Sequence, residues 1–167
     1  MTTFKRHIEI SASKSSIWSI LSDFDAVQKY HPGISRSYYN TDQTMGKGAE
    51  RVCVLIPSGK ILESVKQWEE GSGYILQVEP LEKAPPVKDF LADFQLHDLS
   101  TNTTKVSITI KYDMKLGAIG TLLNKLVIQS KIEKDIEFLL QGLKIHSETG
   151  IEILDREDLK MKLQTKI

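Results

Sequence analysis

The sequence predicts an α+β protein in which an antiparallel sheet wraps around one long helix near the C-terminus. Two observations lead to this prediction. A stretch without proline runs from Leu116 to His146 and precedes Gly150, a typical helix stop. The chain before it alternates apolar and polar residues in short segments separated by turns. At about 1.5 Å per residue the helix would span roughly 45 Å, long enough to cover the apolar face of such a sheet.

The apolar residues of the long helix form two stripes that do not line up at about 100° per residue. The first consists of Ile119, Leu122, Leu123 and Leu126. The second consists of Ile128, Ile132, Ile136, Leu139, Leu140 and Leu143. Either the helix is kinked near Val127, or its two halves pack against different partners. The charged residues of the second half are expected to face water: Lys131, Lys134, Asp135 and Glu137.

The chain before the long helix divides into a strand, two short helices and a series of strands. The pattern predicts a first strand at Phe4–Ile10 and a helix at Lys14–Ser22 with Ser13 as its N-cap. A second short helix should run through Val27 to Lys29 and end before Pro32 and Gly33. Further strands are predicted at Ile34–Asn40, Ala49–Pro57, Lys60–Glu69, Tyr74–Glu79, Asp89–Leu99 and Thr104–Lys115. The segment Pro80–Val87, with three prolines, reads as a loop.

Composition excludes several functional classes. Basic and acidic residues both number 22, so the net charge is zero and no basic stripe suggests a nucleic-acid partner. No apolar run approaches the roughly 20 residues of a membrane span, and the first residues lack the apolar core of a signal peptide. The single cysteine, Cys53, and four histidines without ligand spacing predict no disulfide, metal site or cofactor. A cytoplasmic location is the default expectation.

Several segments together resemble one known superfamily. The first helix and the break after it carry Ile17, Trp18, Asp23 and Tyr30-His31-Pro32. A later hairpin carries Gly46, Gly48, Arg51 and Glu63, and GLKIHSETG closes the long helix. In this combination and element order, residues 4–149 resemble the START-like, or polyketide cyclase/dehydrase-like, superfamily, which is also called SRPBCC or Bet v 1-like.

The resemblance implies a helix-grip fold, in which a curved seven-stranded antiparallel sheet grips the long helix around a mostly apolar cavity. Residues 1–149 would then form a single START-like domain. Residues 150–167 would form a C-terminal tail, which the spacing of Leu159, Leu163 and Ile167 allows to be a short helix.

Alternation and the resemblance together select the residues expected to line such a cavity. From the strands these are Tyr74, Leu76, Phe90, Phe94, Ile108, Ile110 and Tyr112, and from the helix Leu122, Leu123 and Leu126. The alternative is that the same residues form a solid core without a ligand.

Arg51 and Glu63 are the candidate polar groups of the cavity. A two-residue turn at Ser58-Gly59 would place Val54 opposite Glu63. A bulged turn would instead place Leu55 opposite Glu63 and turn Arg51, Cys53, Leu55 and Glu63 to one side. In the hormone-receptor branch of the superfamily the equivalent Arg and Glu face inward, which favours the bulged turn. An exposed surface pair that contributes little remains the alternative.

Three functions are compatible with these residues. The first is binding or carriage of a small hydrophobic molecule, such as a lipid, polyketide or quinone, with transient membrane contact allowed. The second is a cyclase, aromatase or dehydratase in which Arg51 and Glu63 polarise a carbonyl group and move a proton. The third is a protein-interaction module with a vestigial cavity. The oligomeric state stays open.

Overall fold

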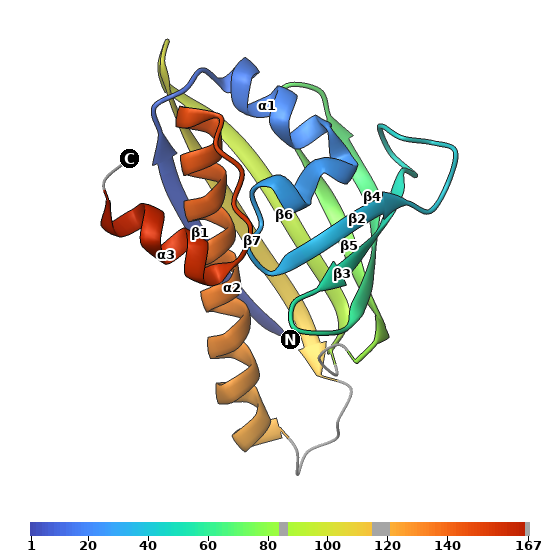
Figure 1. The fold of residues 1–167 in the computed structure, drawn as a ribbon. Helices are drawn as coiled ribbons and strands as arrows, with labels where there is room; N and C mark the ends of the chain where they lie inside the picture. The colour runs from blue at the N-terminus through green and yellow to red at the C-terminus, as the bar shows by residue number, and fades with distance from the viewer. Residues whose placement is uncertain (84–86, 115–120, 166–167) are drawn as a thin grey trace.

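The computed structural model describes residues 1–83, 87–114 and 121–165, and for residues 121–126 the backbone alone. Its elements are β1 (Thr2–Ile10), α1 (Lys14–Ser22), the 3-10 helix η1 (Phe24–Lys29), β2 (Ile34–Tyr39), β3 (Glu50–Leu55), β4 (Lys60–Glu69), β5 (Gly73–Glu82), β6 (Val87–Ser100), β7 (Thr103–Met114), α2 (Thr121–Thr149) and α3 (Arg156–Gln164). This order confirms the predicted α+β helix-grip fold: a curved antiparallel sheet with a long C-terminal helix across it (Figure 1).

The seven strands form one sheet in the order β1-β7-β6-β5-β4-β3-β2. After β1 the chain passes through α1 and η1 to the opposite edge, and β2 to β7 then return strand by strand until β7 pairs with β1. Apolar and polar residues alternate along β7, so its apolar side chains all point to the inner face of the sheet. Four of them, Val106, Ile108, Ile110 and Tyr112, are each 0% exposed. The two short helices close one end of the sheet (Figure 1).

Helix α1 begins at its predicted cap, since the Ser13 side chain accepts a hydrogen bond from the Ser16 backbone N–H. Trp18 fixes the helix to the sheet. Its ring lies 4.9 Å from that of Trp68 in an edge-on arrangement, and its indole N–H donates to Glu70 at 2.8 Å. A large aromatic side chain with a satisfied polar group is a strong anchor for this end of the sheet.

The predicted loop Pro80–Val87 is partly wrong, because β5 continues through Pro80 to Glu82. Within the described residues, β6 pairs with β5 only as far as Val78, whereas β4 continues along β5 past Pro80. One side of β5 is therefore free of ladder partners at this point. A proline is tolerated there because its missing N–H leaves no sheet hydrogen bond unmade.

Helix α2 runs to Thr149, slightly beyond the predicted end at His146. The second predicted stripe is the face that packs on the sheet: Ile132, Ile136, Leu139, Leu140 and Leu143 are all buried. The predicted start at Leu116 and the side chains of Leu122, Leu123 and Leu126 lie outside the described residues, so their predicted contacts stay predictions.

Gly142 lets α2 approach the segment between η1 and β2 closely. A Cβ atom at this position would lie 2.1 Å from the carbonyl oxygen of Tyr30, much less than a van der Waals contact. The helix and the Tyr30–Pro32 segment are consequently pressed together backbone to backbone. This contact positions the segment that carries His31 against the helix.

Candidate functional site

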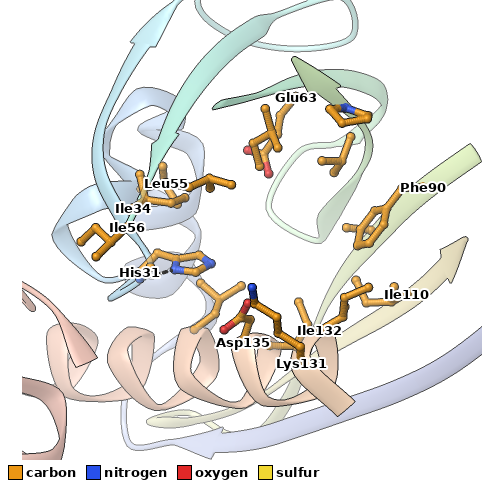
Figure 2. Close-up of a pocket in the computed structure, with 18 of the residues that line it drawn as sticks. His31, Ile34, Leu55, Ile56, Glu63, Phe90, Ile110, Lys131, Ile132 and Asp135 are labelled. Carbon is orange, nitrogen blue, oxygen red and sulfur yellow. Dashed lines mark hydrogen bonds between the residues drawn. The ribbon is translucent and has the colours of Figure 1, made fainter. Parts of the chain in front are cut away.

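A cavity of about 210 Å³ lies between the inner face of the sheet and the second half of α2 (Figure 2). An engineered cavity of about 150 Å³ is large enough to bind benzene. Most of the wall is apolar, with aliphatic and aromatic residues from η1, the β-strands and α2. Those outside the predicted set include Val27, Ile34, Ile56, Ile61, Val78, Val87, Ala92, Ile132, Ile136 and Leu139.

The residues predicted from the sequence fall into two groups. Those that line the cavity are Arg51, Leu55, Glu63, Phe90, Phe94 and Ile110. Those that lie in the packed core behind its wall are Cys53, Tyr74, Leu76, Ile108 and Tyr112. The second group supports the first: the Tyr74 ring packs on Phe94 at 4.9 Å and the Tyr112 ring stacks on Phe90 at 5.7 Å.

Arg51 and Glu63 face each other directly across β3 and β4. The Glu63 Oε2 atom accepts a hydrogen bond from Arg51 Nε at 2.6 Å and forms an ion pair with Arg51 Nη2, also at 2.6 Å. The remaining guanidinium nitrogen donates to the Phe24 carbonyl oxygen, and the guanidinium lies 4.1 Å from the centre of the Phe24 ring. The Arg51 side chain is 2% exposed and that of Glu63 is 12% exposed, with its carboxylate pointing into the cavity (Figure 2).

This pair is stable as an ion pair. Burial alone would lower the pKa of Arg51, but the adjacent Glu63 carboxylate, together with the nearby Cys53, Tyr30 and Tyr74 side chains, outweighs burial, and the pKa of Arg51 is raised. The guanidinium therefore stays charged, and its charge is matched within the fold.

Both predicted hairpin registers are wrong. Arg51 is opposite Glu63, and Val54 is opposite Lys60 rather than Glu63. Pairing stops before Pro57, which has no N–H to give to the ladder, and the Leu55 N–H closes a longer loop by donating to the Gly59 carbonyl at 2.9 Å. The inward facing of Arg51 and Glu63 still agrees with the bulged alternative, since the register differs by an even number of residues.

Cys53 is a core residue and not a nucleophile. It is completely buried, and its thiol lies 3.6 Å from Glu63 Oε2. Burial, reinforced by the Glu63 carboxylate, raises the pKa of Cys53 well above its ordinary value. The reactive thiolate form is consequently suppressed at neutral pH.

His31 was not predicted as a site residue, yet its ring borders the cavity (Figure 2). Its Nδ1 atom accepts a hydrogen bond from the Gly33 N–H at 3.0 Å. Burial lowers the pKa of His31 from 6.5 to about 4. At pH 7 the ring is therefore neutral, and because Nδ1 is an acceptor, the proton resides on Nε2.

The stability of the protein should fall as the pH decreases from about 6.5 to about 4. In this range His31 binds a proton in the unfolded state but stays neutral in the folded state. The contribution of His31 is at most about 3 kcal/mol. Urea unfolding of the wild type and of His31→Asn, compared at pH 7.5 and pH 4.5, measures it. The Asn side chain can keep the bond to Gly33 N–H but does not titrate. An equal loss of stability between pH 7.5 and pH 4.5 in both proteins would show that the pKa of His31 is not lowered in the folded protein.

Charged residues from α2 and α3 gather at the mouth of the cavity. Arg156 Nη2 lies 2.5 Å from Asp135 Oδ1, and both side chains line the opening together with Lys131. Lys131 is exposed, as expected, and also borders the opening. Asp135 is half-buried and paired with Arg156, so the expectation that it simply faces water is wrong. Burial raises the pKa of Asp135, although Arg156 and the neighbouring lysines oppose this shift. Arg156 could not be found by sequence reasoning, because only the docking of α3 brings it to α2.

Within the described residues, no group of His, Cys, Asp or Glu side chains is arranged to hold a metal ion. None of the described helices is long and apolar enough to cross a membrane.

The fold is that of the START-like superfamily, and comparison with known proteins agrees. The family model "Polyketide cyclase / dehydrase and lipid transport" matches residues 1–148, so the chain belongs to this family. No curated protein sequence matches the chain.

Solved structures show the same fold at low sequence identity. The Zhui aromatase/cyclase from a Streptomyces species superposes with a TM-score of 0.72 and 12% identity, covering 88% of this chain and 93% of that one. A START superfamily protein from Mycobacterium smegmatis gives a TM-score of 0.65 and 20% identity, covering 87% and 97%. The XoxI protein from Bacillus cereus gives 0.69 and 16%, covering 86% and 94%.

Proposed function

We propose that this protein binds and carries a small, mainly apolar molecule in the cavity between the sheet and α2. The observation that carries the proposal is an apolar cavity whose deepest charges, Arg51 and Glu63, neutralise each other. Such a wall favours a ligand with little polar surface, because an apolar group gains roughly 25 cal/mol for each Å² removed from water. The family match to lipid transport and cyclase proteins supports the same class of ligand.

Binding of the neutral dye N-phenyl-1-naphthylamine, followed by its fluorescence, tests the proposal. Ile61 lines the cavity, whereas the next residue on β4, Leu62, points to the other face. Ile61→Trp should fill the cavity and weaken dye binding at least about tenfold, or about 1.4 kcal/mol. Leu62→Trp adds the same ring outside the cavity and serves as the matched control.

Two outcomes would contradict carriage in this cavity. Equal dye affinity in both variants would place the dye elsewhere on the protein. A wild-type protein that binds neither the dye nor any apolar compound would favour the interaction-module alternative.

A cyclase or dehydratase is the second candidate, and the position of Glu63 favours it. Its carboxylate points into the cavity, and both the hydrogen bond and the ion pair with Arg51 involve Oε2. The other oxygen, Oε1, accepts no hydrogen bond from the described residues and could exchange a proton with a bound substrate. Arg51 would then hold the carboxylate in place.

Incubation with a linear poly-β-keto thioester, followed by mass spectrometry, distinguishes an enzyme from a carrier. In an enzyme, Glu63→Gln should reduce the rate of cyclisation or water loss by roughly 10²–10⁴-fold while substrate binding persists. If the wild type returns the compound unchanged, the enzyme hypothesis fails for this substrate class and carriage stands.

A further inference from the structure

The charges that line the cavity are unequally distributed. At its deep end Arg51 and Glu63 balance each other. At the mouth Asp135 is already paired with Arg156, and Lys131 adds a further positive charge. No carboxylate of the described residues lies within ion-pair distance of the Lys131 ammonium group, which points toward the cavity in Figure 2. The mouth therefore carries a net positive charge.

The mouth also offers more hydrogen-bond donors than free acceptors. The neutral His31 ring presents its Nε2–H to the cavity, since its Nδ1 is occupied by the Gly33 N–H. Lys131 and Arg156 are donors only. The acceptor among these groups, Asp135, is engaged by Arg156 at 2.5 Å. A ligand group placed here meets several donors and should itself be rich in acceptor oxygens.

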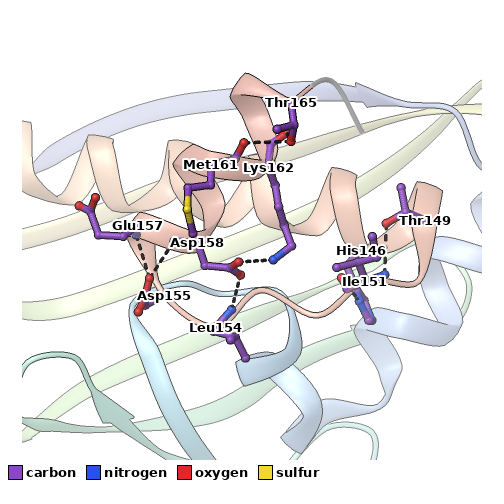
Figure 3. A network of polar contacts seen from close by, with 10 residues as sticks. All are labelled: His146, Thr149, Ile151, Leu154, Asp155, Glu157, Asp158, Met161, Lys162 and Thr165. Atoms are coloured by element: carbon purple, nitrogen blue, oxygen red, sulfur yellow. Dashed lines mark hydrogen bonds and ion pairs between the residues drawn. The ribbon is translucent and has the colours of Figure 1, made fainter.

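Arg156 is held in place by a well-anchored α3. The Asp155 side chain accepts hydrogen bonds from the Glu157 and Asp158 N–H groups, both at 2.9 Å, and Asp158 accepts from the Leu154 N–H and pairs with Lys162 (Figure 3).

Two further contacts bind the segment before α3 and the helix itself to the fold. The Ile153 N–H donates to the Lys29 carbonyl at 2.8 Å. Leu159 is fully buried against the Ile145 and Phe138 side of α2. The helix lies beyond residues 1–148 matched by the family model, so the family match does not by itself imply this wall of the mouth.

From this arrangement, and resting on the proposed function, we propose that the ligand is an anionic amphiphile. Its oxyanion head group, a carboxylate or a phosphate, lies at the mouth between Lys131, Arg156 and His31. Its apolar part extends inward along Phe90, Phe94 and Ile110. An anion at this place satisfies the unpaired donors, whereas a cation would meet Lys131 and Arg156 as like charges.

Displacement of N-phenyl-1-naphthylamine by four compounds with the same eight-carbon chain tests the proposal on the full-length protein. Octanoate is expected to displace the dye at about tenfold lower concentration than octanol, which corresponds to about 1.4 kcal/mol, and octylamine should be the weakest. Octyl phosphate separates the two kinds of head group: displacement equal to or better than that by octanoate assigns a phosphate, and weaker displacement assigns a carboxylate. The preference for the anion should shrink as salt is added.

Two variants localise the effect. Lys131→Gln should bring octanoate and octanol close together, and Asp135→Asn, which releases Arg156 for the ligand, should increase the octanoate preference. Lys134→Gln removes the same charge from α2 at an exposed position outside the cavity and should change the ratio far less than Lys131→Gln.

Equal displacement by octanoate and octanol in the wild type would overturn the anionic head group while leaving carriage of apolar ligands intact. An equal loss of preference in Lys131→Gln and Lys134→Gln would overturn the placement at the mouth. Failure of the dye itself to bind would be a failure of the proposed function, which is a separate result.

Discussion

Gly142→Ala is expected to destabilise the protein by at least about 3 kcal/mol, although alanine is the better helix former by about 1 kcal/mol. The added methyl group would lie 2.1 Å from the Tyr30 carbonyl oxygen and 3.2 Å from its carbon. Both are backbone atoms, so the clash cannot be relieved by a side-chain rotation. Either α2 or the segment entering β2 must move, and the packing around Leu143 and Ile153 moves with it. Urea unfolding followed by circular dichroism measures the loss.

Gly150→Ala is the matched control for this prediction. Gly150 has φ +74°, which disfavours alanine, but nothing lies within 4 Å of an added Cβ. The expected cost is about 1 kcal/mol, which is the conformational penalty without a clash. If Gly142→Ala costs no more than Gly150→Ala, the backbone contact between α2 and Tyr30 is not as close as described.

Arg51→Ala should have a similarly large effect, a loss of about 3–5 kcal/mol, because it leaves the Glu63 carboxylate buried without its partner. Urea unfolding of both proteins at pH 7.5 measures the loss.

The double replacement Arg51→Met/Glu63→Met distinguishes the cost of leaving Glu63 unpaired from the loss of the other contacts of Arg51. Removal of both charges with similar side-chain volume should cost less than Arg51→Ala alone, since no charge is left unmatched. A double variant that is as unstable as the single one would mean that the loss comes from the Arg51 contacts with Phe24 rather than from the unpaired charge of the buried carboxylate.

The strands could be predicted because their signal is local. The alternation from Val106 to Met114 reports the two faces of β7 directly, and Ser13 with the residues after it reports the start of α1. Where the prediction failed, distant partners decided the outcome. Pro80 lies within a strand because β6 leaves β5 before reaching it, and the hairpin register depends on how far β3 and β4 remain paired.

The cavity could be predicted only in part for the same reason. Phe90, Phe94 and Ile110 follow from alternation on β6 and β7, but alternation cannot tell a wall residue from a core residue such as Ile108, which points to the same face. The polar mouth was missed altogether. His31, Asp135 and Arg156 come from three separate elements, and their charges and donors meet only after α2 and α3 have docked.

The pairing of β1 with β7 has a consequence for biosynthesis. Thr2 lies opposite Tyr112, so the first strand of this sheet must wait after synthesis until the last strand of the sheet has been translated. At about 5–20 residues per second this delay is roughly 5–20 s. During it the apolar side chains of Phe4, Ile8 and Ile10 and the backbone groups of β1 have no sheet to join. The nascent chain is therefore most prone to aggregation just before β7 emerges, and β1 is the last strand to pair within the sheet.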